Sequence, residues 1–214
     1  MYHNADGTEA GAVGRWNLDY DTKTFGQVSR VDDGWITGGM SSPRPLYRLP
    51  DLIDAETVYV CEGEKAADAI RSLDLVGTSP SQGGKSPKLT GWKVLDGKRV
   101  VILPDNDADG EKFATSVADL IRQQAPTAAV EVKRLIDDWP EISTKGDAHD
   151  WSEFNNGADA ETLRLRLEAL PESGPALRQI FHSNEGQPPG PSYSQVDCND
   201  IGNAAHFAKL NGDR

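Results

Sequence analysis

Hydrophobic positions between about residues 51 and 170 follow two alternating patterns, one typical of strands and the other typical of helices. The clearest strand is the run 98–104, whose nearly continuous apolar side chains indicate burial on both faces. The other predicted elements are strands at 57–61, 75–78 and 129–135 and helices at 64–73, 111–124, 151–154 and 160–170. Strands and helices that alternate through short connections predict an α/β fold, with a parallel sheet of about four strands flanked by helices.

The flanks of this segment have different patterns. Residues 1–50 contain many glycines and short alternating runs, with Asp-Gly pairs at 6–7 and 33–34 that favour hairpin turns. We therefore expect a small β-rich N-terminal region before a domain at 51–170. Residues 171–196 are rich in Pro, Gly, Ser and Gln, so we expect a flexible, disordered linker there.

The amino-acid composition excludes several classes of protein. The chain of 214 residues has a net charge of −12, which excludes a broad basic surface for nucleic acid. A polyanionic partner must therefore be bound through local positive charge or through metal ions. The sequence has no apolar run near the roughly 20 residues of a membrane helix and no secretory signal pattern. Two cysteines, Cys61 and Cys198, cannot form a disulfide framework or a zinc site, and we expect a cytoplasmic protein.

Acidic side chains follow three of the predicted strands. Glu62 comes directly after the strand at 57–61, Asp105 and Asp107 follow the central strand, and Asp147 lies beyond the strand at 129–135. The carboxyl ends of parallel strands meet at one edge of a sheet, where open α/β folds bind their ligands. Carboxylates gathered there repel one another unless cations neutralise them. Hard oxygen ligands of this kind favour Mg²⁺ or Mn²⁺.

Two other interpretations apply to these carboxylates. A single aspartate after a strand often caps a helix, and Asp105 or Asp109 could cap the helix expected near residue 110. The spacing of Asp105, Asp107 and Asp109 also matches the first half of a calcium-binding EF-hand loop. However, Ser116 occupies the twelfth position, where that loop needs a glutamate, and the preceding element is a strand. Capping of one helix is common, but it does not explain three acidic clusters together.

The acidic elements resemble the Toprim domain, a fold shared by bacterial-type primases, type IA and type II topoisomerases and some nucleases. The family pattern is a strand followed by Glu-Gly and a helix, and later a strand that ends in Asp-x-Asp-x-x-Gly. In this chain the two elements are Val58 to Lys65 and Val101 to Gly110. A later stretch, Lys145 to Trp151, resembles the Gly-x-Asp-x-x-Asp element that follows the Toprim core in phage and plasmid primases. The resemblance covers about residues 56–156.

The resemblance implies roles for the acidic residues. Asp105 and Asp107 would bind divalent metal ions, Mg²⁺ or Mn²⁺, with Asp147 as a further ligand. Glu62 would act as a ligand or as a general acid or base beside the reacting phosphate. The implied activity is that of a DNA primase, which joins ribonucleotides on single-stranded DNA and uses the ribonucleotide 3′-hydroxyl as nucleophile. Two alternatives remain open: a Toprim nuclease with the same carboxylates, and a non-catalytic module that binds nucleic acid or a partner.

The flanks add an expectation about partners. Residues 1–50 resemble the segment before Toprim in prophage primase-helicase proteins. Residues 200–207 resemble the opening of the next module in those proteins, so 197–214 would be the start of a truncated module. The resemblance thus implies single-stranded DNA and nucleoside triphosphates as partners, and a replicative helicase module in cis or in trans.

Basic residues offer candidate contacts for phosphate. The stretch 81–99 is the most positive part of the chain and includes Lys85 and Lys88, which either contact template or triphosphate or are ordinary solvated lysines. Lys65 lies three residues after Glu62 at a predicted helix start, a position that favours anions. His149 either ligates metal or phosphate or is a polar surface residue, and we favour the surface interpretation.

Overall fold

The computed structural model describes residues 1–17, 23–85 and 87–172. All of the described residues belong to one compact unit. The linker predicted at 171–196 lies outside the described residues from 173 onward, and so does the module predicted at 197–214.

A parallel sheet of four strands forms the centre of the described chain, as the sequence predicts. Its strands are β5 (Thr57–Cys61), β6 (Gly77–Thr78), β7 (Arg99–Leu103) and β8 (Ala129–Val132), in the spatial order β6-β5-β7-β8. Successive side chains of β5 and β7 point to opposite faces and enter two separate hydrophobic clusters. Both central strands are therefore buried on both faces, which explains their nearly continuous apolar runs.

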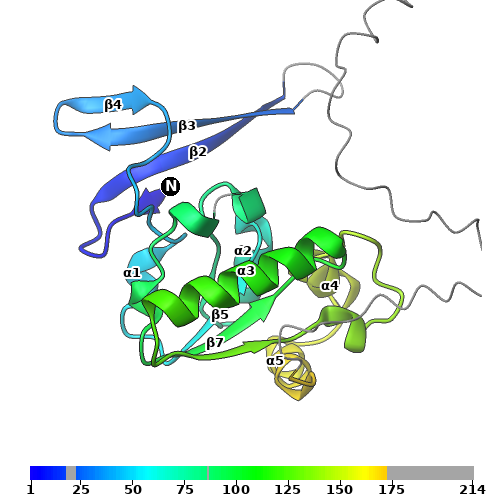
Figure 1. Ribbon diagram of the computed structural model, residues 1–214. Coiled ribbons are helices and arrows are strands. Elements are labelled where there is room, and N and C mark those ends of the chain that lie inside the picture. Colours follow the sequence, from blue (N-terminus) through cyan, green and yellow to red (C-terminus); the bar gives the residue numbers. More distant parts are fainter. Residues whose placement is uncertain (18–22, 86, 173–214) are drawn as a thin grey trace, which may run out of the picture. The chain divides into compact units, whose positions relative to one another are not determined.

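Helices cover both faces of this sheet (Figure 1). On one face, α3 (Ala108–Gln124) packs Phe113, Val117 and Ile121 onto the strands. The other face is covered by α2 (Glu64–Arg71), α4 (Ala148–Phe154) and α5 (Ala160–Ala169). In the described part of the chain, no helix is both long and apolar enough to cross a membrane.

Short elements connect the larger ones. They are α1 (Leu49–Leu52) and four 3₁₀ turns, η1 (Gly83–Lys85), η2 (Pro87–Leu89), η3 (Lys93–Leu95) and η4 (Leu135–Asp137). The last of these corrects a predicted boundary: the strand expected at 129–135 ends at Val132, because the chain turns into η4. The strand expected at 75–78 is likewise reduced to Gly77–Thr78.

The N-terminal residues form an antiparallel sheet in the order β1-β2-β3-β4, which confirms the expected β-rich region. Its strands are β1 (Tyr2–His3), β2 (Glu9–Asn17), β3 (Lys23–Val31) and β4 (Gly34–Thr37). Tyr2 is buried, and its hydroxyl donates a hydrogen bond to Glu64 at 2.5 Å. The first strand is thereby bonded to the first turn of α2, the helix that follows Glu62.

A polar network joins α5 to the start of the parallel strands. The Arg99 guanidinium donates two hydrogen bonds to the Glu168 carboxylate, at 3.0 and 2.8 Å. Tyr59 also donates to Glu168, and the buried Lys133 ammonium lies 3.7 Å from it. The hydrogen bonds from Arg99 lower the pKa of Glu168 to about 2. Arg99 is the first residue of β7 and Tyr59 is the middle residue of β5, so the network does not include the acidic residues that follow these strands.

We predict that Glu168→Gln destabilises the protein in a pH-dependent way. Because folding lowers the pKa of Glu168 from about 4.5 to about 2, its ionised form adds stability above pH 4.5 that is lost as the pH falls towards 2. In urea unfolding, the stability difference between wild type and Glu168→Gln should be constant above pH 5 and should shrink between pH 4.5 and 2. The control is Glu161→Gln, an exposed residue of the same helix, and a difference that does not change with pH would contradict the prediction.

Candidate active site

Glu62 and Asp105 lie together because β5 and β7 are neighbours that end level with each other. Cys61 pairs with Leu103, so the residues that follow both strands emerge at the same edge of the sheet. There the backbone N–H of Asp105 donates to the Glu62 carboxylate at 3.4 Å. The two motifs, 43 residues apart in sequence, therefore meet at one point.

Asn106 connects this edge to the loop that carries Asp147. Its backbone N–H donates to Gly146 O at 2.9 Å, and the Lys145 N–H donates back to Asn106 O at 3.2 Å. Its side-chain amide donates to the carbonyls of residues 142 and 143. The central residue of the Asp-Asn-Asp run thus fixes the loop, while the aspartates on either side keep their carboxylates for other partners.

Two of the candidate ligands also cap helices. The Asp107 carboxylate accepts hydrogen bonds from the N–H groups of Asp109 and Gly110 at the start of α3. Asp147 accepts from His149 and Asp150 at the start of α4. The suggested caps Asp105 and Asp109 are therefore wrong, because Asp107 is the residue with extended backbone directly before the helix. These caps also explain why α3 begins at Ala108 and α4 at Ala148, each three residues earlier than predicted.

Capping leaves one oxygen of each aspartate available. In both caps the backbone N–H groups bond to Oδ1. No hydrogen bond from the described residues reaches Oδ2 of Asp107 or Asp147. A single carboxylate can therefore hold a helix start and still offer an oxygen to a cation.

The carboxylates at this edge are close enough to repel one another. Burial raises the pKa of Asp105 to about 7, and the negative charges of Glu62, Asp147, Asp107 and Asp150 add to the effect. The pKa of Glu62 is also raised, first by burial, although the Asp105 N–H lowers it and the charges of Asp107 and Asp147 raise it further. The four predicted ligands thus form one electrostatically coupled group.

This group is not a closed metal cage. Among the residues that the structure describes, no three His, Cys, Asp or Glu side chains are arranged to hold a metal ion. Mg²⁺ is usually bound through one or two carboxylates, with water and substrate phosphates as the remaining ligands. The carboxylates form an open group of hard oxygen ligands that repel one another. Such a group fits Mg²⁺, which takes water and substrate phosphates as further ligands, better than a closed site of protein ligands would.

Two glycines allow the backbone to pack tightly around the carboxylates. A Cβ at Gly110 would overlap the Asp105 carbonyl oxygen, so the turn from strand to helix closes only with glycine there. A Cβ at Gly84 would lie 2.8 Å from Oε2 of Glu62. The close contact at Gly110 explains the glycine of the Asp-x-Asp-x-x-Gly pattern. The close contact between Gly84 and Glu62 was not expected from the sequence.

A pocket of about 680 Å³ adjoins Glu62, between α3 and the segment 82–89. Phe113 and Leu89 contribute apolar surface, while Lys88 and Lys112 contribute positive charge. Lys112 was not among the residues predicted from the sequence. It follows Asp109 by three residues on α3, and its Nζ lies 2.7 Å from Oδ1 of Asp109. The signal that could have found it is the position of Lys112 in the first turns of the helix that follows the acidic motif.

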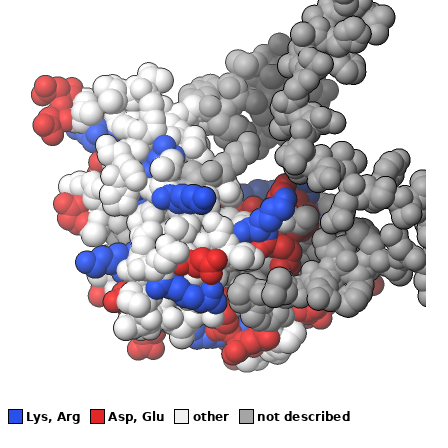
Figure 2. Space-filling model, in the orientation of Figure 1, with Lys and Arg blue, Asp and Glu red and all other residues white. Residues whose placement is uncertain are grey.

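The basic residues predicted to contact phosphate do not lie together in the structure. Lys88 lines the pocket beside Glu62, whereas Lys65 lines another pocket between α2 and α4. The side chain of Lys85 is outside the described residues. On the face drawn in Figure 2, Lys and Arg side chains lie mostly apart, with uncharged and acidic side chains between them. The lysines therefore supply local positive charge, as expected for an acidic chain.

Comparison with known families agrees with this geometry. Residues 57–135 match the family model of the Toprim domain. The matched segment runs from β5 to the first residue of η4 and contains Glu62, Asp105 and Asp107, while Asp147 lies beyond it. This segment of the chain is therefore similar to a Toprim domain. None of the curated proteins matches the sequence.

Several solved structures are similar to the chain. One is a chain in a structure of the bacteriophage T7 lagging-strand DNA polymerase interacting with primase domains of two gp4 subunits bound to an RNA/DNA hybrid and dTTP. Its sequence identity is 18% and its TM-score is 0.49, with coverage of 75% of this chain and 78% of that one. Another is a DNA primase domain from Pseudomonas aeruginosa, at 13% identity and a TM-score of 0.48, covering 80% of this chain and 50% of that one. A third is the Aquifex aeolicus primase, at 16% identity and a TM-score of 0.42, covering 74% and 44%. The chain thus spans about half the length of the two bacterial structures.

We predict that Gly110→Ala destabilises the protein by about 1–3 kcal/mol, because the added methyl group must displace the Asp105 backbone. Gly157→Ala is the matched control, since a Cβ there meets nothing within 4 Å. Urea unfolding of both variants measures the effect. Equal stability of Gly110→Ala and Gly157→Ala would contradict the tight packing of the acidic turn.

We predict that Asp105→Asn stabilises the metal-free protein at pH 8, by on the order of 1 kcal/mol, because it removes one buried charge from a self-repelling group. Added Mg²⁺ should raise the melting temperature of wild type and should not raise that of Asp105→Asn. Thermal unfolding in EDTA and in Mg²⁺ measures both effects. The control is Asp54→Asn, an exposed aspartate outside the group. Destabilisation of metal-free Asp105→Asn would show that the Asp105 charge is not repelled in the folded protein.

Proposed function

We propose that the chain is the catalytic segment of a DNA primase, which uses divalent metal ions to join ribonucleotides on single-stranded DNA. The observation that carries the proposal is the coupled carboxylate group at the edge of a Toprim sheet, in which Asp105 N–H lies 3.4 Å from the Glu62 carboxylate. An acidic protein can bind polyphosphate there only through cations. Mg²⁺ or Mn²⁺ fits the oxygen ligands.

We assign the aspartates to metal binding. Asp105, Asp107 and Asp147 would hold the cations, with Oδ2 of the two capping aspartates facing no other donor in the described residues. The bound ions would lower the pKa of the attacking 3′-hydroxyl and neutralise charge on the pyrophosphate that leaves. The caps fix the direction of the carboxylates, because Oδ1 of each is held by backbone N–H groups.

We assign proton transfer to Glu62. Its raised pKa makes it a better proton acceptor than an ordinary solvated glutamate, and it lines the pocket of about 680 Å³ beside α3. In that pocket, Lys88 and Lys112 would contact the triphosphate, and Phe113 would pack against the base or sugar. Primer synthesis requires such a space for the incoming nucleoside triphosphate, whereas a nuclease uses no triphosphate and attacks the strand with water next to the metal ions.

The described tyrosines do not support a topoisomerase, which needs a reactive tyrosine. Tyr2 is buried and bonded to Glu64, and Tyr59 is buried in the network with Glu168. Tyr47 donates to Asp68 on α2. All three hydroxyls are therefore engaged in hydrogen bonds within the protein.

The proposal extends to partners. Single-stranded DNA and nucleoside triphosphates are the proposed substrates, and a replicative helicase module, in cis or in trans, is the proposed partner. A helicase module encoded in the same or the neighbouring reading frame would support this partner. The absence of one there would contradict it and would leave the catalytic proposal unchanged.

The test of the catalytic proposal is an assay with single-stranded DNA, the four ribonucleoside triphosphates and Mg²⁺ or Mn²⁺. We expect short RNA products from wild type and a loss of at least about 100-fold in Asp107→Asn, because metal binding supplies several kcal/mol of transition-state stabilisation. Asparagine caps helices as well as aspartate does, so this variant keeps the start of α3 and loses the charge.

The matched control is Asp159→Asn, which makes the same change at the cap of α5, away from the acidic edge. It should retain full activity. Shortened DNA without RNA products would identify a nuclease and contradict the primase proposal. Full activity of Asp107→Asn would contradict the assignment of the metal ligands.

A further inference from the structure

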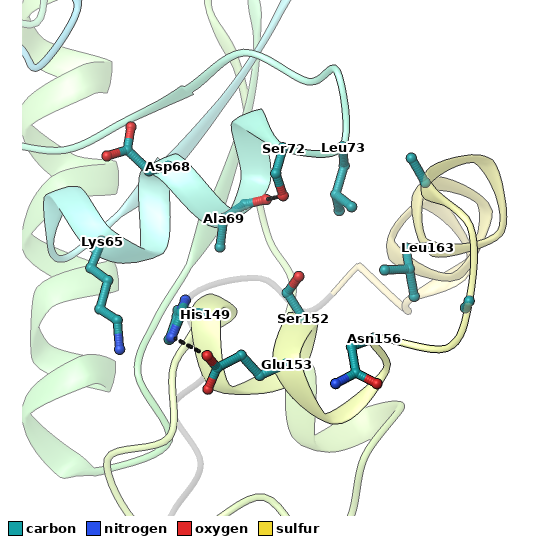
Figure 3. Close-up of a pocket in the computed structure, with 12 residues that line it drawn as sticks. Lys65, Asp68, Ala69, Ser72, Leu73, His149, Ser152, Glu153, Asn156 and Leu163 are labelled. Carbon is teal, nitrogen blue, oxygen red and sulfur yellow. Dashed lines mark hydrogen bonds and ion pairs between the residues drawn. The ribbon is translucent and has the colours of Figure 1, made fainter.

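A second pocket lies between α2, α4 and the start of α5, on the sheet face opposite α3 (Figure 3). Its volume is about 590 Å³, within the range of roughly 300–1,000 Å³ for small-molecule sites. The helices α2 and α4 pack against each other, and each begins directly after the acidic edge, at Gly63 and Asp147. One end of the pocket is therefore close to the carboxylates, and the other end lies farther along the two helices.

The end near the carboxylates holds the Lys65 ammonium and a pair formed by His149 and Glu153. Lys65 and His149 lie in the first turns of α2 and α4, and Figure 3 shows their side chains extending towards each other across the pocket. No residue in the described part of the chain forms a hydrogen bond or ion pair with the Lys65 ammonium. His149 Nε2 lies 3.1 Å from the Glu153 carboxylate, which holds the ring in place.

The nearest acidic residue on α2 does not cancel this charge. Asp68 also lines the pocket, but its carboxylate points away from Lys65 in Figure 3. It accepts hydrogen bonds from the Tyr47 hydroxyl and lies 3.4 Å from Arg48. Its charge is therefore paired with Arg48, and Lys65 remains available for an anion.

The far end of the pocket is apolar with a few polar groups. Leu73, two residues after the end of α2, and Leu163 of α5 contribute apolar surface. The Ser152 hydroxyl points into the space between them and α4, and Asn156 lines the same end (Figure 3). The pocket thus has a cationic end, an apolar end and hydrogen-bonding groups along its wall.

We propose that this pocket binds a nucleotide unit, with its phosphate at Lys65 and His149 and its base against Leu73 and Leu163. A nucleotide joins one anionic group to a flat, largely apolar ring with polar edges, which matches the two ends of the pocket and the Ser152 hydroxyl. The unit is either a free nucleotide or one residue of a single strand. The proposal goes beyond the proposed function, because none of the four predicted metal ligands lines this pocket and Lys65 and His149 contact the phosphate without metal.

The experiment measures binding of fluorescently labelled AMP, and of a labelled 5′-phosphorylated oligodeoxythymidylate, to the full chain in EDTA at low ionic strength. We expect wild type to bind at least one probe, and Lys65→Ala to weaken that binding at least 10-fold. Ser152→Trp, which fills the pocket, should abolish it. Binding of AMP assigns a free nucleotide, and binding of the oligonucleotide alone assigns a residue of a strand.

Two controls locate the site. Lys93→Ala removes an exposed lysine that lines neither of the two pockets and should leave binding in EDTA unchanged. Asp107→Asn should also bind normally in EDTA even where it makes no RNA, which separates this proposal from the catalytic one. Failure of wild type to bind either probe in EDTA would overturn the proposal. Equal binding by wild type and Lys65→Ala, or an equal loss in Lys93→Ala, would also overturn it. Because Lys65 is exposed, its substitution tests the site even if Ser152→Trp does not fold.

Discussion

Repulsion between carboxylates at the edge of the parallel sheet is the constraint on which the site depends. The pairing of β5 with β7 brings Glu62 to Asp105, and the bonds of Asn106 bring the loop of Asp147 to the same place. Burial and neighbouring charges then raise the pKa of Asp105 to about 7. If these residues served stability alone, replacing one of the charged carboxylates by a neutral side chain would make the folded protein more stable. Their presence together therefore supports the proposal that this edge binds a cation.

The same carboxylates contribute to the fold through their caps. Asp107 and Asp147 each accept hydrogen bonds from two backbone N–H groups at a helix start. The residues that cap the helices are therefore the same residues that we propose as metal ligands. Capping fixes the carboxylates on rigid elements, which is what a site that positions phosphate oxygens requires. Gly110 completes this arrangement, because its missing side chain lets α3 start directly against the Asp105 backbone.

The sequence predicted the sheet and the meeting of its acidic ends because both follow from local patterns. Nearly continuous apolar runs mark β5 and β7, and parallel strands must end at a common edge. The starts of α3 and α4 were placed too late, since more than one aspartate near each start could cap the helix and residue type alone does not choose among them. The role of Asn106, the contact of Gly84 with Glu62 and the pocket between α2 and α4 depend on residues far apart in sequence. Periodicity and motif spacing contain no information about such contacts.

The most direct test of the central claim is a crystal structure of the protein grown with Mn²⁺ and measured for anomalous scattering. The account predicts a manganese peak at the edge of the parallel sheet, with carboxylate oxygens of Asp105 and Asp107 about 2.1 Å from the ion. An ordered acidic edge with no manganese peak, in crystals that contain Mn²⁺ at millimolar concentration, would contradict it.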